Sequence, residues 1–337
     1  MPLRADGATS QSLPIFHVGG FGDIEAHTHS SSRREDLNAA ELDVFATLQL
    51  SNSWSALADA VALKSWNTRA DEKSVEIELE RLYVEYSTSD AFRLELGETE
   101  TGIVRWSARE HRSRFLQTPV DVPAIARRPA EDGAWPLRFI GARGSGRMSG
   151  PLGLTWAAGA GVGPGPVREA VPVFGGGRSP AALLLLSSSP ESIPGFDTGA
   201  AVYAQEVHSR PDRIRERDVT LWVNYVSHGD EMRIEWARMN HSLTSNPAMF
   251  VTTGYYALLS KRLSGRAEHA RPYVLLDRLR VARGESYLGE AADENAWAAG
   301  LRYDVTQRFN VKTELRSQRS VAGHRESVLG LELGTSF

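Results

Sequence analysis

The chain of 337 residues has no cysteine and no apolar run long enough to cross a bilayer as a helix. The first absence excludes a disulfide framework and any cysteine-based metal or redox centre. The second excludes a helical membrane protein, because a spanning helix needs about 18 consecutive apolar residues. A transmembrane β-barrel stays possible, since each of its strands needs only about 9–11 residues and turns half of its side chains to a polar interior.

The chain also lacks an excess of basic charge. It has 38 lysines and arginines against 42 aspartates and glutamates, which gives a formal net charge of −4 and an isoelectric point near 6.2. This balance argues against a nucleic-acid partner, because nucleic-acid-binding domains are normally basic. No apolar h-region follows Met1, so we expect that an exported form of this chain has already lost its signal peptide.

The last nine residues alternate apolar side chains with small or polar ones. Leu329, Leu331, Leu333 and Phe337 share one parity with Thr335, and the other parity holds only Gly, Glu and Ser. Successive side chains of a strand point to opposite faces, so this segment has one apolar face. An aromatic residue at the end of such a strand suits the aromatic girdle of a membrane barrel. The pattern is typical of a closing barrel strand.

Similar segments recur along the chain and predict about sixteen strands, with no helix of useful length between them. The predicted strands are 16–30, 41–51, 54–66, 75–86, 92–98, 137–147, 152–161, 181–188, 195–207, 219–226, 231–236, 250–259, 272–280, 297–305, 309–316 and 328–337. Their even spacing favours an all-β fold, a closed antiparallel transmembrane barrel in up-and-down order. We expect residues 13–337 to form this single domain, after a flexible segment, 1–12.

The connections between these strands alternate in length. Short ones are expected at 52–53, 87–91, 149–151, 227–230, 264–267 and 307–308, and long ones at 31–37, 67–73, 103–136, 162–180, 208–216, 281–295 and 317–324. Outer-membrane barrels show this asymmetry, with the short turns on the periplasmic rim. A soluble protein of two packed sheets would show the same alternation within strands, but the difference between its rims would be a coincidence.

The strand predicted at 75–86 changes phase in its middle. Val75, Ile77 and Leu79 are apolar at odd positions, whereas Leu82 and Val84 are apolar at even ones. One extra residue in a strand shifts the parity of all that follow it. We therefore predict a β-bulge near residues 80–81.

The longest connection, 103–136, is rich in arginine and follows the fifth strand. Connections of this length are usually functional or disordered. It also contains Trp106, Phe115 and Trp135, which favour burial, so we expect it to fold into the lumen as a constriction loop. The alternative is an external loop whose arginines pair with its own acids or with lipopolysaccharide phosphates. Its arginines are Arg105, Arg109, Arg112, Arg114, Arg127 and Arg128.

Basic side chains in a constriction favour the passage of anions, because fixed positive charge offsets part of the anion's lost hydration. Guanidinium groups also bind carboxylate and phosphate through paired hydrogen bonds. Arg105, Arg109, Arg112 and Arg114 are the strongest candidates for the constriction. Further candidates for lining the pore or binding anions are Arg127, Arg128, Arg143, Arg147, Arg302, Lys312 and Arg316.

Two other motifs carry weaker chemistry. His27 and His29 share one strand face, as in a metal site, but no third ligand is evident, and lumen polarity explains them better. Asn240, His241 and Ser242 are adjacent, so on a strand they point to opposite faces and do not form a nucleophile–base pair. We therefore expect no catalytic residue, no metal and no cofactor.

Several short stretches, in order along the chain, resemble the outer-membrane porins of the phosphate-selective O/P type and their uncharacterised bacterial porin relatives. These stretches are 21–23, 80–86, 92–97, the arginine-rich segment through Trp106, His111 and Leu116, then 272–273 and 300–305. The resemblance implies sixteen strands, a homotrimer, a constricting third loop and a place in the bacterial outer membrane, in contact with its lipid and lipopolysaccharide. Phosphate selectivity does not follow, because the basic ladder that carries it cannot be located here.

Together these features predict an outer-membrane porin for the passive diffusion of small hydrophilic solutes, with anions favoured by an arginine-lined constriction. One alternative is a barrel that acts as a structural sheath or partner-docking scaffold in an envelope complex, its lumen occupied by another chain. A second alternative is a soluble, exported β-rich binding protein, which would not need detergent.

Overall fold

The computed structural model describes residues 13–30, 35–66, 75–110, 114–127, 133–164, 179–209, 212–244, 249–284, 288, 293–319 and 325–337. The segment predicted to be flexible, 1–12, lies outside the described residues. No helix among them is long and apolar enough to cross a membrane.

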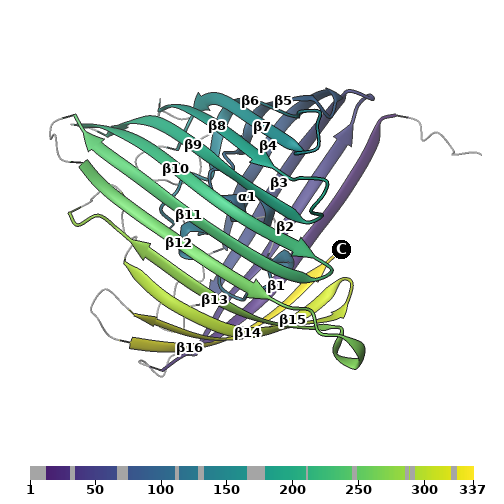
Figure 1. Cartoon of the computed structure of the whole chain (residues 1–337), viewed down its shortest axis with the longest axis vertical. Coiled ribbons are helices and arrows are strands. Elements are labelled where there is room, and N and C mark those ends of the chain that lie inside the picture. Colours follow the sequence, from purple (N-terminus) through teal and green to yellow (C-terminus); the bar gives the residue numbers. More distant parts are fainter. Residues whose placement is uncertain are drawn as a thin grey trace, which may run out of the picture.

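The described residues form sixteen antiparallel strands that close into one barrel, each strand paired with its neighbours in sequence and β16 paired with β1 (Figure 1). The predicted fold class is therefore confirmed. The strands are β1 (Ile15–His29), β2 (Glu35–Gln49), β3 (Trp54–Trp66), β4 (Val75–Ser89), β5 (Phe92–Glu100), β6 (Arg138–Arg147), β7 (Leu154–Val162), β8 (Pro180–Ser188), β9 (Phe196–Ser209), β10 (Asp212–Ser227), β11 (Asp230–Leu243), β12 (Met249–Ser260), β13 (Ala270–Arg280), β14 (Glu294–Thr306), β15 (Phe309–Arg319) and β16 (Arg325–Ser336). Closure leaves the sheet without an open edge, which is how a barrel avoids unpaired backbone groups.

The pairing of β1 with β16 continues to the rim that carries the short turns. The backbone N–H of Gly20 donates to the carbonyl of Phe337 (3.2 Å), and the N–H of Phe337 donates to the carbonyl of Gly20 (3.0 Å). Two-residue turns at 228–229 and 307–308 lie on the same rim. We call this rim the short-turn rim.

One predicted long connection is wrong. Most of 208–216 is strand, because β9 runs to Ser209 and β10 begins at Asp212, with Arg213 opposite His208 and Glu216 opposite Gln205. The inward face of this stretch still alternates, with Ile214 and Glu216 buried, but its outward face is charged. The strands thus extend beyond the apolar part of the outer surface, where an outward apolar residue no longer marks them.

The predicted bulge is confirmed in β4. Arg81 is paired with Asp59 and Leu79 with Ala60, so Glu80 has no partner in the ladder. The side chains of Glu80 and Arg81 are consecutive and both are buried, at 1% and 5% exposure. The extra residue therefore turns two successive side chains to the interior and keeps apolar side chains outside on both sides of it.

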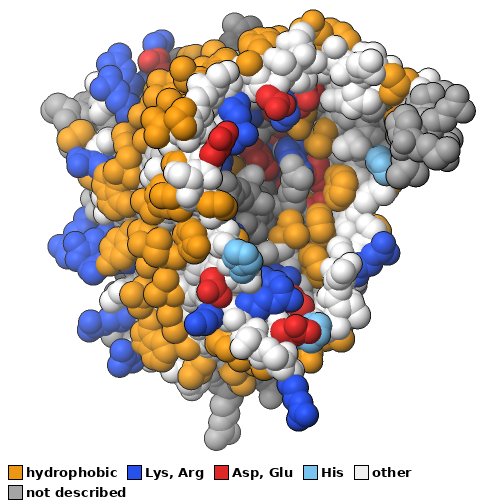
Figure 2. All heavy atoms as spheres, turned by 45° about the vertical axis from the view of Figure 1, so that its right-hand side comes forward, with side chains coloured by type: hydrophobic (Ala, Val, Ile, Leu, Met, Phe, Trp, Pro, Cys, Tyr) orange, Lys and Arg blue, Asp and Glu red, His pale blue; other side chains and the backbone are white. Residues whose placement is uncertain are grey.

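Strand by strand, apolar side chains cover the outer surface. On β8, Leu184 and Leu186 point outward with 46% and 55% exposure, whereas Leu183 and Leu185 are buried. Figure 2 shows an apolar band over the outer surface and a hollow at the mouth of the barrel that acidic and basic side chains line. An apolar exterior around a charged interior is the arrangement of a membrane barrel.

The interior is not polar throughout. A hydrophobic core inside the barrel joins Ile103, Trp106, Ile125 and Trp135 of the 103–136 segment to inward apolar side chains of β6 to β14, among them Leu185. The two ends of the segment are tied together, because the Thr101 N–H donates to the Leu137 carbonyl (2.7 Å). On β8 the inner face is apolar because the loop covers this part of the wall, so apolar residues are stable there.

Candidate functional site

A short helix of the loop, α1 (Arg105–Glu110), lies inside the barrel (Figure 1). Its first N–H groups have no partner within the helix. Glu235 of β11 supplies one, since its carboxylate accepts the N–H of Arg105 (2.5 Å), the N–H of Trp106 (3.1 Å) and the hydroxyl of Tyr256 (3.1 Å). A carboxylate is the group that the start of a helix favours. An inward acid of the wall thereby holds the loop in place.

The side chain of Arg105 binds the wall as well. Its Nε and Nη2 lie 3.1 and 3.3 Å from the two carboxylate oxygens of Asp197 on β9. The guanidinium group stacks over the ring of Trp222, 5.5 Å from the ring centroid, and the Trp222 indole donates to the same carboxylate (3.1 Å). Two parallel hydrogen bonds and an aromatic face fix Arg105 against β9 and β10.

Arg114 binds the opposite side of the interior. It begins the 3-10 helix η1 (Arg114–Leu116), forms an ion pair with Glu25 of β1, and lies 3.8 Å from Glu41 of β2. The ammonium group of Lys312 donates a hydrogen bond to the backbone carbonyl of Arg114. Lys312 also pairs with Glu332 at 2.7 Å, and neither side chain of that pair is exposed.

The second half of the loop is held by a network on β13 to β15. Arg127 donates to both oxygens of Glu294 (2.6 and 3.0 Å), and Arg316 bridges Glu294 and Asp277 (2.9 Å to Asp277). The Asp277 carboxylate also accepts the N–H of Ala124, in the 3-10 helix η2 (Ala124–Ala126), at 2.9 Å. The loop thus lies along the wall from β9 round to β1.

Asp121 completes this network from the loop side, 3.5 Å from the Arg316 guanidinium. Burial alone would raise the pKa of the Asp121 carboxyl. The neighbouring Arg316, His27 and Arg127 outweigh burial and lower that pKa below its usual value. The carboxylate is therefore charged, and it belongs to the contacts that dock the loop.

The remaining basic residues named from sequence are also accounted for. Arg143 pairs with Glu95 (3.0 Å) across β5 and β6, Arg302 pairs with Asp304 (2.7 Å), and Arg147 is exposed at the end of β6. The side chain of Arg109 and the whole of Arg112 and Arg128 lie outside the described residues.

Carboxylates neutralise most of these cations. Within the described part of the chain, each of the seven buried or half-buried basic residues named from sequence has a carboxylate within 4 Å: Arg105, Arg114, Arg127, Arg143, Arg302, Lys312 and Arg316. In the described residues these basic groups are therefore paired with carboxylates and do not stand as isolated positive charges. Sequence reasoning missed their partners, such as Asp197 and Glu235, because a pairing between distant strands leaves no local signal.

The two histidines that were weighed as metal ligands, His27 and His29 of β1, are bound to acids of the wall. His27 lies 3.3 Å from Glu25, and His29 lies 3.2 Å from Glu326. Among the described residues, no group of three His, Asp or Glu side chains is arranged to hold a metal ion. Both imidazoles thus have a carboxylate partner.

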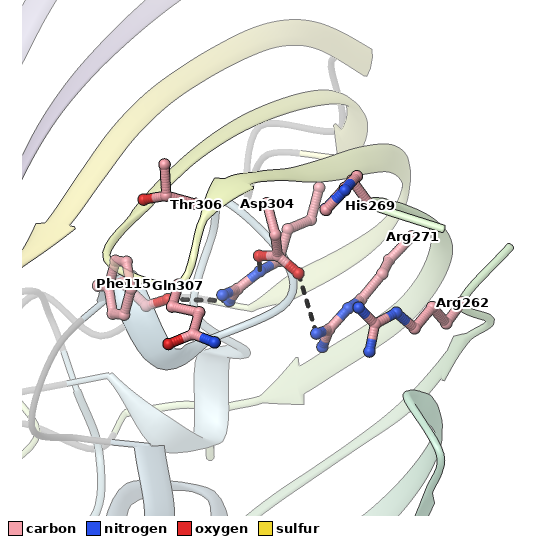
Figure 3. Close-up of a pocket in the computed structure, with 8 residues that line it drawn as sticks. Phe115, Arg262, His269, Arg271, Asp304, Thr306 and Gln307 are labelled. Carbon is pink, nitrogen blue, oxygen red and sulfur yellow. Dashed lines mark hydrogen bonds and ion pairs between the residues drawn. The ribbon is translucent and has the colours of Figure 1, made fainter. Parts of the chain in front are cut away.

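A cavity of about 550 Å³ lies between the loop and the short-turn rim (Figure 3). Its basic lining was largely missed from sequence, because Arg262 and Arg271 stand singly near the ends of neighbouring strands and form no motif. Of its cations only Arg302 was named. The lining residues are Phe115, Arg262, His269, Arg271, Arg302, Asp304, Thr306 and Gln307.

No family model matches the chain, and no curated protein matches it. Solved structures match over nearly the whole length. OmpT of Vibrio cholerae, an outer-membrane protein in its trimer form, is 8% identical, and the match covers 97% of this chain and 100% of that chain with a TM-score of 0.64. The outer-membrane channel DcaP of Acinetobacter baumannii is 11% identical, with 98% and 99% coverage and a TM-score of 0.62.

A third match is OmpF of Salmonella typhi, in a complex with daunomycin. It is 11% identical, with 96% and 100% coverage and a TM-score of 0.63. At these identities the likeness shows the fold alone. The fold is that of bacterial outer-membrane porins and channels.

Proposed function

We propose that this protein is a porin of the bacterial outer membrane, through which small hydrophilic solutes diffuse passively. The observation that carries the proposal is a closed sixteen-stranded barrel with an apolar exterior, a charged interior and a loop docked inside it. A water-filled barrel with a polar lining passes solutes without any moving part. In this proposal no described residue has a catalytic role.

The location follows from the surface. The apolar outer side chains suit lipid, and the structural neighbours include proteins described as outer-membrane proteins and channels. By the same analogy the short-turn rim faces the periplasm and the longer loops face lipopolysaccharide. We also propose a homotrimer, which one OmpT form supports by analogy. The likeness supports porins in general and does not single out the phosphate-selective O/P type.

We propose further that the loop forms an arginine-bearing constriction, and that small anions are the favoured solutes. Arg105, Arg114 and Arg127 are each paired with a carboxylate. An anion preference must therefore come from basic groups whose charge is not neutralised by a carboxylate. The cavity near the short-turn rim carries such charge. Inward carboxylates that remain ionised act in the opposite direction, and the reversal potential measures the balance.

Planar-bilayer recording of the detergent-purified chain tests this function. We expect discrete conductance steps, and a reversal potential under a salt gradient that has the sign of anion preference. Arg114→Gln should change the conductance, because it releases η1 from Glu25, whereas Arg213→Gln, at an exposed side chain of β10, should not. Folded, inserted protein without conductance would overturn the porin and favour the scaffold alternative. Cation-selective steps would overturn only the anion preference.

A further inference from the structure

In the lining of the cavity near the short-turn rim, basic side chains outnumber acidic ones. Its wall holds three guanidinium groups and an imidazole against one carboxylate, that of Asp304. With neutral His269, three positive charges and one negative charge leave an excess of +2. From this geometry we infer that the cavity is a binding site for small organic carboxylates with an apolar or aromatic body.

Arg302 forms the inner end of the site and is itself satisfied. It pairs with Asp304 (2.7 Å) and donates to the carbonyls of Phe115 (2.8 Å) and Gln117 (2.7 Å). Its guanidinium carbon lies 5.7 Å from the centroid of the Phe115 ring. The loop therefore fixes both the cation and the aromatic ring at this end of the cavity.

Arg271 has unused hydrogen-bonding capacity. Its Nη2 lies 2.9 Å from Asp304, which already serves Arg302, and its buried Nε has no hydrogen-bond partner among the described residues. Arg271 and Arg302 both line the cavity and share the single carboxylate of Asp304. An anion in the cavity would add a second negative group beside these two cations.

Arg262 is the cation at the opening. Its Nε donates to the carbonyl of Glu268 (2.7 Å), and among the described residues no carboxylate lies within 4 Å of its guanidinium group. Figure 3 shows Arg262 and Arg271 on the side of the cavity opposite Phe115 and Gln307. An anion that enters from the rim meets Arg262 first.

The chemistry of the lining favours a carboxylate with a carbon body. A guanidinium fork binds the two oxygens of a planar carboxylate in parallel, and two such groups face the cavity. The Phe115 ring offers an apolar surface at the far end, and aromatic rings pack well against it. The Thr306 hydroxyl and the Gln307 amide add hydrogen-bonding groups that suit the remaining polar atoms.

Calorimetric titration of the full chain in detergent tests the site, with benzoate as the probe and benzamide as its uncharged analogue. We expect benzoate to bind and benzamide to bind at least tenfold more weakly, because charge-assisted hydrogen bonds are lost. Arg262→Gln should weaken benzoate binding about tenfold. Arg262→Lys keeps the positive charge but loses the paired donors of the guanidinium group. Its affinity for benzoate should therefore lie between those of the native chain and Arg262→Gln.

Arg266→Gln is the matched control, because Arg266 is an exposed arginine in η4 (Gly265–Ala267), near Arg262, and does not line the cavity. It should bind benzoate like the native chain. Equal binding of benzoate and benzamide, equal losses in Arg262→Gln and Arg266→Gln, or tighter binding of inorganic phosphate than of benzoate would each overturn the inference. A chain that conducts without binding benzoate refutes only this site, and one that binds benzoate without conducting refutes only the porin.

Discussion

Replacing Glu235 by leucine should release the loop from the barrel wall. The Glu235 side chain is fully buried and holds three donors, the N–H groups of Arg105 and Trp106 and the hydroxyl of Tyr256. Leucine removes the acceptor of all three. Each buried donor left without a partner costs about 1–3 kcal/mol. The Tyr256 hydroxyl can rotate toward another acceptor, so we expect the docked loop to lose roughly 3–5 kcal/mol, counted from the two helix N–H groups and part of the third.

Glu235→Gln should cost less. The glutamine side chain keeps one carbonyl oxygen for the start of α1, and a neutral acceptor is about half as strong as a charged one. We expect about 1–2 kcal/mol for this variant. The pair of variants separates loss of the acceptor from loss of its charge.

Hydrogen exchange at the α1 amides, read by mass spectrometry on the detergent-solubilised protein, measures the opening of the loop. Each 1.4 kcal/mol is a factor of ten in an equilibrium constant, so exchange in Glu235→Leu should be faster by about two to three and a half orders of magnitude. The barrel strands should exchange as before. Glu95→Gln is the control, because the partners of Glu95, Arg143 and Thr99, belong to the wall. Unchanged α1 exchange in Glu235→Leu would refute the reasoning.

Three further changes test the barrel itself, each by urea unfolding in lipid vesicles followed by tryptophan fluorescence. Lys312→Met breaks the buried pair with Glu332 and should lower stability by about 3–5 kcal/mol. The double variant Lys312→Met/Glu332→Leu should recover the part that comes from the unpaired carboxylate, but not the hydrogen bond of Lys312 to the Arg114 carbonyl; equal losses would contradict a role for the unpaired charge. Deleting Phe337 removes two backbone hydrogen bonds to Gly20 and should cost about 1–3 kcal/mol, and Phe337→Ala, which keeps both, should lose less. Deleting Glu80 should prevent folding, because it turns the residues of β4 before the bulge to the wrong face, while Glu80→Ala keeps the register and should fold; a deletion variant that folds like the native chain would show that the bulge is dispensable.

The strands were predictable because lipid-facing and inward side chains alternate. The bulge at Glu80 was predictable for the same reason, since a shift of parity is visible in the sequence. Where the outward face becomes charged, as at Arg213 and Arg215 of β10, the signal ends although the strand continues. The strand limits predicted from sequence therefore follow the apolar band of the outer surface, whereas the observed hydrogen-bonded pairing extends past that band.

The site was predictable only in part. Trp106 and Trp135 indicated that the loop is buried, and both are buried at 1% exposure or less. The partners of its arginines were not predictable, because Arg105 and Asp197 are 92 residues apart and only the closed barrel brings them together. The basic cavity was missed for the same reason.

The docking of the loop also bears on the order in which the barrel is assembled. The loop follows β5, yet most of its contacts are with strands that come later in the chain, and the others are with β1 and β2. Trp106 and Trp135 are large side chains in a core that has walls on several sides. Entry through the mouth of a finished barrel would require these bulky groups to pass the rim and the charged pairs to form last. We therefore expect the loop to fold against the strands before β16 pairs with β1. The later strands would then pair around a loop that is already in position.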